Sequence, residues 1–160
     1  MPFDVEPRME EKLVRPNIVT KCYGCSPENP EGLKLEFFKC GPDEVRTRCN
    51  LRSSLSGWPG ILHGGFVSML LDETACWAVS GITGWRPVAT VEMMIKFLKP
   101  VPVEQDIQVS ARLIERADPR FRLWAEVINP QGEICATAEV TCVEIQIEKF
   151  ARKYDIKGII

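Results

Sequence analysis

The chain has 160 residues, of which 45% are hydrophobic and 26% charged, values typical of one globular domain that can bury its own core. Twenty basic and twenty-two acidic residues give a net charge of -2 without a long run of either sign, which argues against a nucleic-acid surface. No apolar run reaches the roughly 20 residues that a membrane-spanning helix needs, and residues 1–21 lack a secretion-signal pattern. We therefore expect a cytoplasmic protein that is not inserted in a membrane.

The first half of the chain contains a predicted hairpin. Residues 1–20 form a polar arm punctuated by prolines, and a turn-rich segment follows it. Apolar and polar residues then alternate over 33–37, and again over 45–51 after the turn Gly41-Pro42-Asp43. This pattern predicts two antiparallel strands.

The second half begins with a segment that is apolar almost all the way round, residues 65–79, which predicts a helix enclosed by protein. Four alternating segments follow, joined by short turns, at 88–99, 107–116, 121–128 and 134–147. Short connections imply antiparallel neighbours, so we expect the α+β class, with a curved antiparallel sheet of about six strands round one central buried helix. The predicted domain covers 21–147, and the tail at 148–160 could form a short helix.

Seven cysteines, an odd number, are spread over segments that otherwise look like core strands, which favours reduced thiols. Cys22 and Cys25 have the spacing of half a zinc site. A structural zinc site needs four ligands, and no second Cys-x-x-Cys or Cys/His pair follows to supply the other two. The sequence therefore predicts thiols in a tight turn and no metal site.

The chain's only histidine, His63, stands directly before Gly64 and Gly65 at the start of the buried helix. Glycines allow a ligand to approach the backbone, and the free N–H groups of a first helical turn attract anions. A thioester carbonyl that becomes an oxyanion needs such donors. Close packing of the two glycines against a strand is the alternative explanation.

Further along the same helix, Ser68, Asp72 and Cys76 are spaced four residues apart and form one polar stripe on an apolar cylinder. A buried carboxylate costs several kcal/mol unless it is hydrogen-bonded or paired, so Asp72 is a candidate catalytic acid. Glu73, rotated by about 100° on the helix, is the rival. The alternative for Asp72 is a polar contact at an interface, without chemistry.

The run from His63 to Glu73 resembles the His-Gly-Gly helix of the hotdog thioesterases of the phenylacetic-acid-degradation and 4-hydroxybenzoyl-CoA type, in which an acid follows the histidine by nine positions. Asp72 occupies that position. The segment 22–35 resembles a stretch found in one branch of the same group. The resemblance covers roughly residues 21–147 and implies the hotdog fold and hydrolysis of an acyl-CoA thioester.

The resemblance also implies roles for single residues. Asp72 would act as nucleophile or as general base for water, the Gly64 N–H would polarise the carbonyl, and His63 would shape the loop. Thr90, near the start of the strand after the helix, corresponds to an assisting hydroxyl, and Glu73 remains the rival acid.

Four further positions are expected to contact substrate: Gly57, Gly65, Ser68 and Cys76. Cys76 occupies a place where relatives can carry a hydroxyl. Gly57 is a departure, because relatives often have Asn or Gln six residues before the histidine. That role could shift to the neighbouring Ser56.

By the same resemblance, hotdog subunits pair edge to edge, so that the acid of one subunit faces the His-Gly-Gly loop of another. We expect a homo-oligomer, a dimer or a dimer of dimers, with no cofactor apart from the coenzyme A of the substrate. One alternative is a non-catalytic domain that binds acyl-CoA or another acyl ligand, which Gly57 favours. Another is a hotdog hydratase or dehydratase, which would need a histidine placed for acid–base chemistry on the acyl chain.

Overall fold

The computed structural model describes residues 10–15 and 21–158. Its elements are β1 (Glu10–Lys12), β2 (Phe38–Cys40), β3 (Glu44–Asn50), the 3-10 helix η1 (Ser53–Leu55), α1 (Gly64–Thr83), β4 (Val88–Phe97), β5 (Asp106–Ala117), β6 (Arg120–Ile128), β7 (Ile134–Glu144) and α2 (Ile147–Lys153). The predicted central helix, the four strands after it and the short helix in the tail are confirmed, with ends that differ by a few residues.

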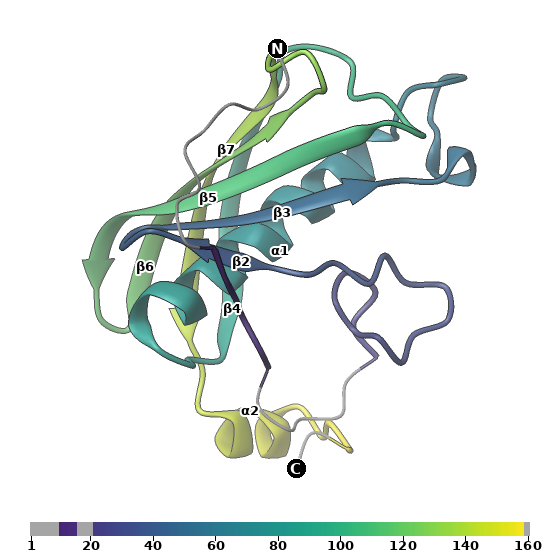
Figure 1. Ribbon diagram of the computed structural model, residues 1–160. Helices are drawn as coiled ribbons and strands as arrows, with labels where there is room; N and C mark the ends of the chain where they lie inside the picture. Colours follow the sequence, from purple (N-terminus) through teal and green to yellow (C-terminus); the bar gives the residue numbers. More distant parts are fainter. Residues whose placement is uncertain (1–9, 16–20, 159–160) are drawn as a thin grey trace.

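The seven strands form one antiparallel sheet in the order β1-β2-β3-β5-β6-β7-β4. Figure 1 shows this sheet curving round α1, with α2 beyond one end of the strands. The arrangement confirms the predicted α+β class, a curved antiparallel sheet round a central helix.

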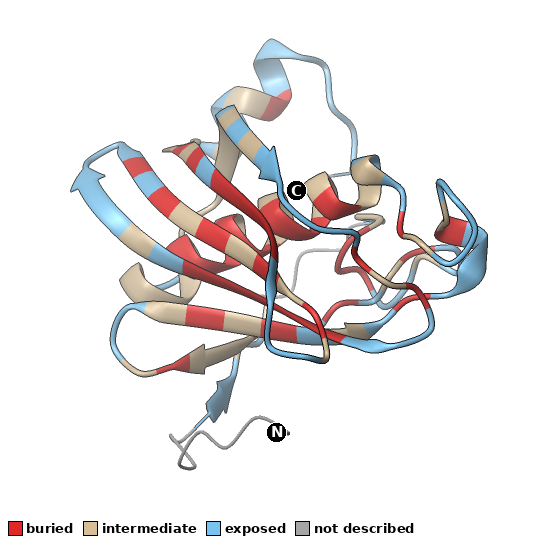
Figure 2. Ribbon diagram, turned by 90° about the horizontal axis from the view of Figure 1, so that it is seen from above, coloured by how far each residue is buried: buried red, intermediate tan, exposed pale blue. Residues whose placement is uncertain are grey.

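The core lies between the concave face of the sheet and α1. Along β6, Phe121, Leu123, Ala125 and Val127 are fully buried and alternate with more exposed residues, which produces the banded strands of Figure 2. The helix contributes eight buried residues, namely Val67, Leu70, Leu71, Thr74, Ala75, Trp77, Ala78 and Val79. Packing therefore fixes the position of α1 against the sheet. It also fixes where the functional side chains of the helix begin.

The first part of the sheet differs from the prediction. The segment 33–37 is not a strand, because the N–H groups of Leu33 and Leu35 donate to the carbonyl oxygens of Tyr23 and Gly24 instead of to a neighbouring strand. β2 begins only at Phe38. The extra strand β1 lies inside the predicted arm and pairs with β2, so the sheet has one strand more than expected.

β4 is the last strand of the sheet and pairs only with β7 among the described residues. Several apolar side chains on or just after β4 are more than half exposed, namely Val91, Met94, Phe97 and Leu98. An edge strand of this length, with apolar side chains in water, favours association with another chain. None of the described helices combines the length and the apolar character needed to cross a lipid bilayer.

Candidate functional site

His63 caps the amino-terminal end of α1. Its exposed ring accepts a hydrogen bond at Nδ1 from the Gly65 N–H, at 2.9 Å, and its carbonyl oxygen accepts from Phe66 and Val67. Gly64 N–H has no hydrogen-bond partner among the described residues. It is the donor left free at the positive end of the helix dipole, where an oxyanion would be stabilised.

A groove of about 720 Å³ lies beside this donor and is lined in part by His63, Gly64, Phe97 and Lys99. A Cβ added to Gly64 would lie 3.5 Å from the Phe97 ring, which is an ordinary contact, whereas one added to Gly65 would lie only 3.2 Å from His63 Nδ1. Close packing thus explains the glycine at 65 but not the glycine at 64. This difference favours a functional reason for Gly64.

Gly57 lies against His63, and a Cβ there would lie 3.3 Å from His63 Cα. A larger side chain at position 57 would have to displace the histidine, which gives a packing reason for the missing amide. The neighbouring Ser56 hydroxyl donates to the Ser53 carbonyl oxygen at 2.6 Å. The Ser56 hydroxyl proton is therefore already donated within the same turn.

Asp72 lies in the middle of α1, half-buried, and accepts a hydrogen bond at Oδ1 from the Thr90 hydroxyl of β4, at 2.5 Å. Cys76 Sγ lies 3.3 Å from Thr90 Oγ1 and 3.8 Å from Cys142 Sγ. Hydrogen bonding to Cys142 and burial raise the pKa of Cys76, which keeps it a neutral thiol. Asp72 Oδ2 has no hydrogen-bond partner among the described residues.

Asp72 and Thr90 line a pocket of about 530 Å³ whose other walls include Trp77, Trp85 and Phe150. Trp77 and Trp85 meet edge to face with centroids 6.2 Å apart. The pocket thus combines the carboxylates of Asp72 and Glu73 with aromatic walls suited to an apolar group. Trp58, the other tryptophan close to the motif in sequence, lies in the groove beside His63.

Within one chain, Gly64 and Asp72 do not meet. They line different pockets, and eight residues of helix separate them by about 12 Å along the axis. Ser68, between them, donates its hydroxyl to the Gly64 carbonyl oxygen at 2.8 Å. The structure therefore groups the predicted residues into two half-sites, one with His63 and the glycines and one with Asp72, Thr90 and Cys76.

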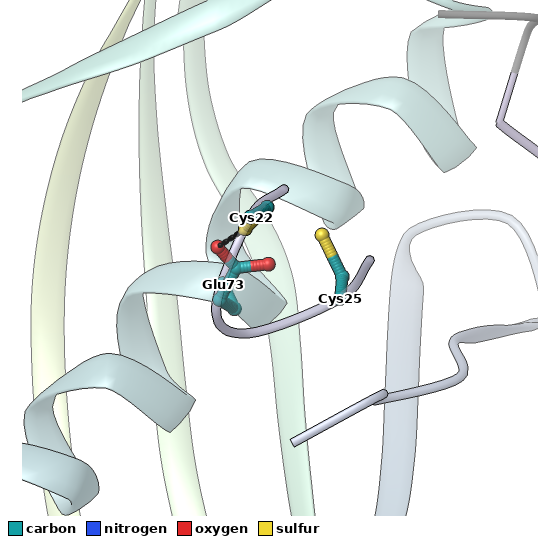
Figure 3. A group of neighbouring side chains, drawn as sticks. All are labelled: Cys22, Cys25 and Glu73. Atoms are coloured by element: carbon teal, nitrogen blue, oxygen red, sulfur yellow. Dashed lines mark hydrogen bonds between the residues drawn. The ribbon is translucent and has the colours of Figure 1, made fainter. Parts of the chain in front are cut away.

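Glu73 has a different environment from Asp72, although it also reaches the wall of the pocket. Its side chain points to Cys22 and Cys25, and the Cys22 thiol donates to Glu73 Oε1 at 3.1 Å (Figure 3). Burial raises the pKa of Glu73 to about 7. A hydrogen bond with Cys25 lowers the pKa of Cys22, and the same hydrogen bond raises the pKa of Cys25.

Sequence reasoning missed three neighbours of these groups. Cys142 lies in the predicted strand 134–147 and Phe150 in the predicted tail at 148–160, and neither carried a functional signal. Arg15, which lines the pocket and donates to Cys25 Sγ, lies in the predicted arm and carried no signal.

Comparison with known proteins finds similarity to thioesterases. Residues 59–136 match the family model of the Thioesterase superfamily. A candidate esterase of Saccharolobus solfataricus is 29% identical over 109 residues, which is 68% of this chain and 72% of that protein. Acyl-coenzyme A thioesterase THEM4 of Bos taurus is 30% identical over 115 residues, 69% of this chain, and the chain spans only 44% of that relative's length.

Solved structures share the fold. The thioesterase superfamily protein RHA08564 has a TM-score of 0.66 and 21% identity, with 74% of this chain and 57% of that chain covered. The PaaI protein of the E. coli phenylacetic acid degradation operon has a TM-score of 0.64 and 15% identity, over 71% and 80%. A Streptococcus mutans protein bound to acetyl CoA has a TM-score of 0.62 and 18% identity, over 69% and 88%. These neighbours confirm the predicted hotdog fold.

Proposed function

We propose that this chain is a hotdog-fold acyl-CoA thioesterase, which hydrolyses a thioester to the free acid and coenzyme A. The match of residues 59–136 to the Thioesterase superfamily model and the shared fold support this proposal. The observation that carries this proposal is Asp72, a carboxylate with one oxygen held by Thr90 and the other without a partner among the described residues, beside a pocket with aromatic walls. The names of two similar proteins support the substrate class, since one is an acyl-coenzyme A thioesterase and the other was solved with acetyl CoA.

The proposed reaction divides the work between two groups. The Gly64 N–H donates to the thioester carbonyl oxygen and stabilises the oxyanion, an interaction worth about 3–4 kcal/mol per donor. Asp72 either attacks the carbonyl carbon or removes a proton from the water that attacks it. His63 holds the loop through its hydrogen bond with Gly65 N–H, which leaves the Gly64 N–H directed at the substrate.

The two groups can act on one substrate only if they come from different chains, because they lie in separate pockets of a single subunit. We place the second chain at the free edge of β4, where exposed apolar side chains and unpaired backbone groups favour pairing with a copy of the same strand. The acyl group would then enter the aromatic pocket beside Asp72.

Mixing of inactive variants tests the shared site. Asp72→Asn and a Gly64 variant with a bulky side chain, such as Gly64→Leu, each remove one half-site. Heterodimers formed by refolding an equal mixture hold one intact site, so roughly a quarter of the wild-type activity should return for random pairing in a two-fold dimer. If the mixture stays inactive although heterodimers form, both groups come from one chain and the proposal of a shared site fails.

A second candidate function is non-catalytic binding of an acyl ligand, which Gly57 favours because no amide is present to position a carbonyl or a water. A thiol-release assay over short, medium, long and aromatic acyl-CoAs separates the two. Release that depends on Asp72 supports the thioesterase. Ligand-induced thermal stabilisation without release of thiol across the whole panel supports the binding domain.

A further inference from the structure

Three side chains that can bind a metal ion converge on the side of α1 next to Asp72. They are the thiols of Cys22 and Cys25, from the turn before β2, and the carboxylate of Glu73 (Figure 3). One ligand atom from each lies within 4.8 Å of the other two. In a tetrahedral zinc site, two thiolate ligands at 2.3 Å from the ion lie about 3.8 Å apart, so only a small closure is needed.

The turn that carries the two cysteines is held in place before any ion binds. Ser26 N–H donates to the Cys22 carbonyl oxygen at 3.1 Å, which closes the turn that carries both cysteines. The N–H groups of Leu33 and Leu35 donate to the carbonyl oxygens of Tyr23 and Gly24 and hold the turn in place. Gly24 permits the contact with the helix, because a Cβ there would lie 2.5 Å from Glu73 Cδ.

The charges of the cluster also fit a divalent cation. Two thiolates and one carboxylate carry three negative charges, which is unfavourable for side chains that are half-buried or buried. The Arg15 guanidinium donates to Cys25 Sγ at 2.5 Å and supplies one positive charge. A divalent ion brings the sum to neutrality, and an Arg N–H bonded to a metal-bound thiolate is a typical outer contact of such sites.

We propose that Cys22, Cys25 and Glu73 form a metal site that binds a zinc-type divalent cation. Two thiolates select a borderline-soft ion over Mg²⁺ or Ca²⁺, which prefer oxygen ligands. The described residues supply three ligands, so water completes the tetrahedron. The ion connects the turn at 22–25 to Glu73 of α1, the residue directly after Asp72.

The site is testable without any assay of turnover. The full chain, purified with reductant and stripped of metal, is titrated with Zn²⁺ and, as a spectroscopic probe, with Co²⁺. We expect one ion per chain, and a cobalt spectrum with the visible bands of a tetrahedral site and a sulfur-to-cobalt charge-transfer band. Reduced wild-type chain that binds no ion, or that binds Co²⁺ without the charge-transfer band, overturns the proposal.

Variants show which residues bind the ion. Cys22→Ser with Cys25→Ser should abolish binding, and Glu73→Gln should weaken it by more than tenfold. Cys49→Ser is the matched control, because that half-buried thiol lies outside the cluster and should leave the stoichiometry unchanged. Uptake that persists in the double variant, folded by circular dichroism, would mean adventitious binding elsewhere. If the double variant does not fold, the cobalt spectrum of the wild type decides.

Discussion

Replacement of Asp72 by Asn removes the proposed base and little else. The amide oxygen can still accept the Thr90 hydroxyl at the position of Oδ1, where the native bond measures 2.5 Å. The new NH₂ group replaces Oδ2, which has no partner among the described residues, so the free energy of unfolding should change by less than about 1 kcal/mol. The substitution is therefore a clean test of chemistry.

The expected loss in kcat for Asp72→Asn is about 10²–10⁴-fold, the range for a general base. At 1.36 kcal/mol for each factor of ten, this equals roughly 3–5 kcal/mol of transition-state stabilisation. Thiol release with the best acyl-CoA of the panel measures the loss. Asp43→Asn, the same change in an exposed turn, is the matched control.

Asp72 is not the catalytic acid if Asp72→Asn keeps the wild-type kcat/KM. The parallel variant Glu73→Gln tests the rival acid, and the rival wins if Glu73→Gln alone lowers kcat by a hundredfold or more. Thermal unfolding of both variants separates lost chemistry from lost folding.

Gly64, the edge of β4 and the metal cluster each give one testable prediction. Gly64→Ala should lower kcat/KM about tenfold or more by crowding the substrate carbonyl. Tm should stay near the wild-type value, because the new Cβ would lie 3.5 Å from the Phe97 ring, an ordinary contact. Full activity would mean that substrate does not approach this backbone. Met94→Arg puts a charge on the exposed edge of β4 and should give inactive monomers in sedimentation experiments, whereas an active monomer contradicts the shared site. Zn²⁺ at a hundred times its Kd should stabilise the fold by about 2.7 kcal/mol and raise Tm by about 5–10 °C, and an unchanged Tm would argue against the metal site.

Local patterns in the sequence were enough for most of the fold. The all-round apolar segment became α1, and alternation with a period of two located β4 to β7, because burial against one core imposes these periods on the sequence. The pattern failed at Leu33 and Leu35, which alternate as in a strand but bond to the turn at 22–25. It also missed β1, whose three residues are charged and exposed and owe their conformation to pairing with β2.

The site was predicted only where its parts lie close in sequence. His63, the glycines and Asp72 share one helix, so their spacing was visible. Glu73 lies 48 residues after Cys25, and only the packing of the turn onto α1 brings them together. For this reason the sequence showed half of a metal site and no partner for it.

The neighbouring acids of α1 illustrate how one helix can serve two purposes. Asp72 faces Thr90 and the pocket, whereas Glu73, one residue on, faces the two thiols. If both proposals hold, the two isosteric variants must differ in kind. Asp72→Asn should lose turnover and bind the metal as the wild type does. Glu73→Gln should bind the metal more than tenfold more weakly and keep most of its turnover once folded. A single variant that removed both properties together would show that the ion takes part in the reaction, and that the two faces of the helix are one site.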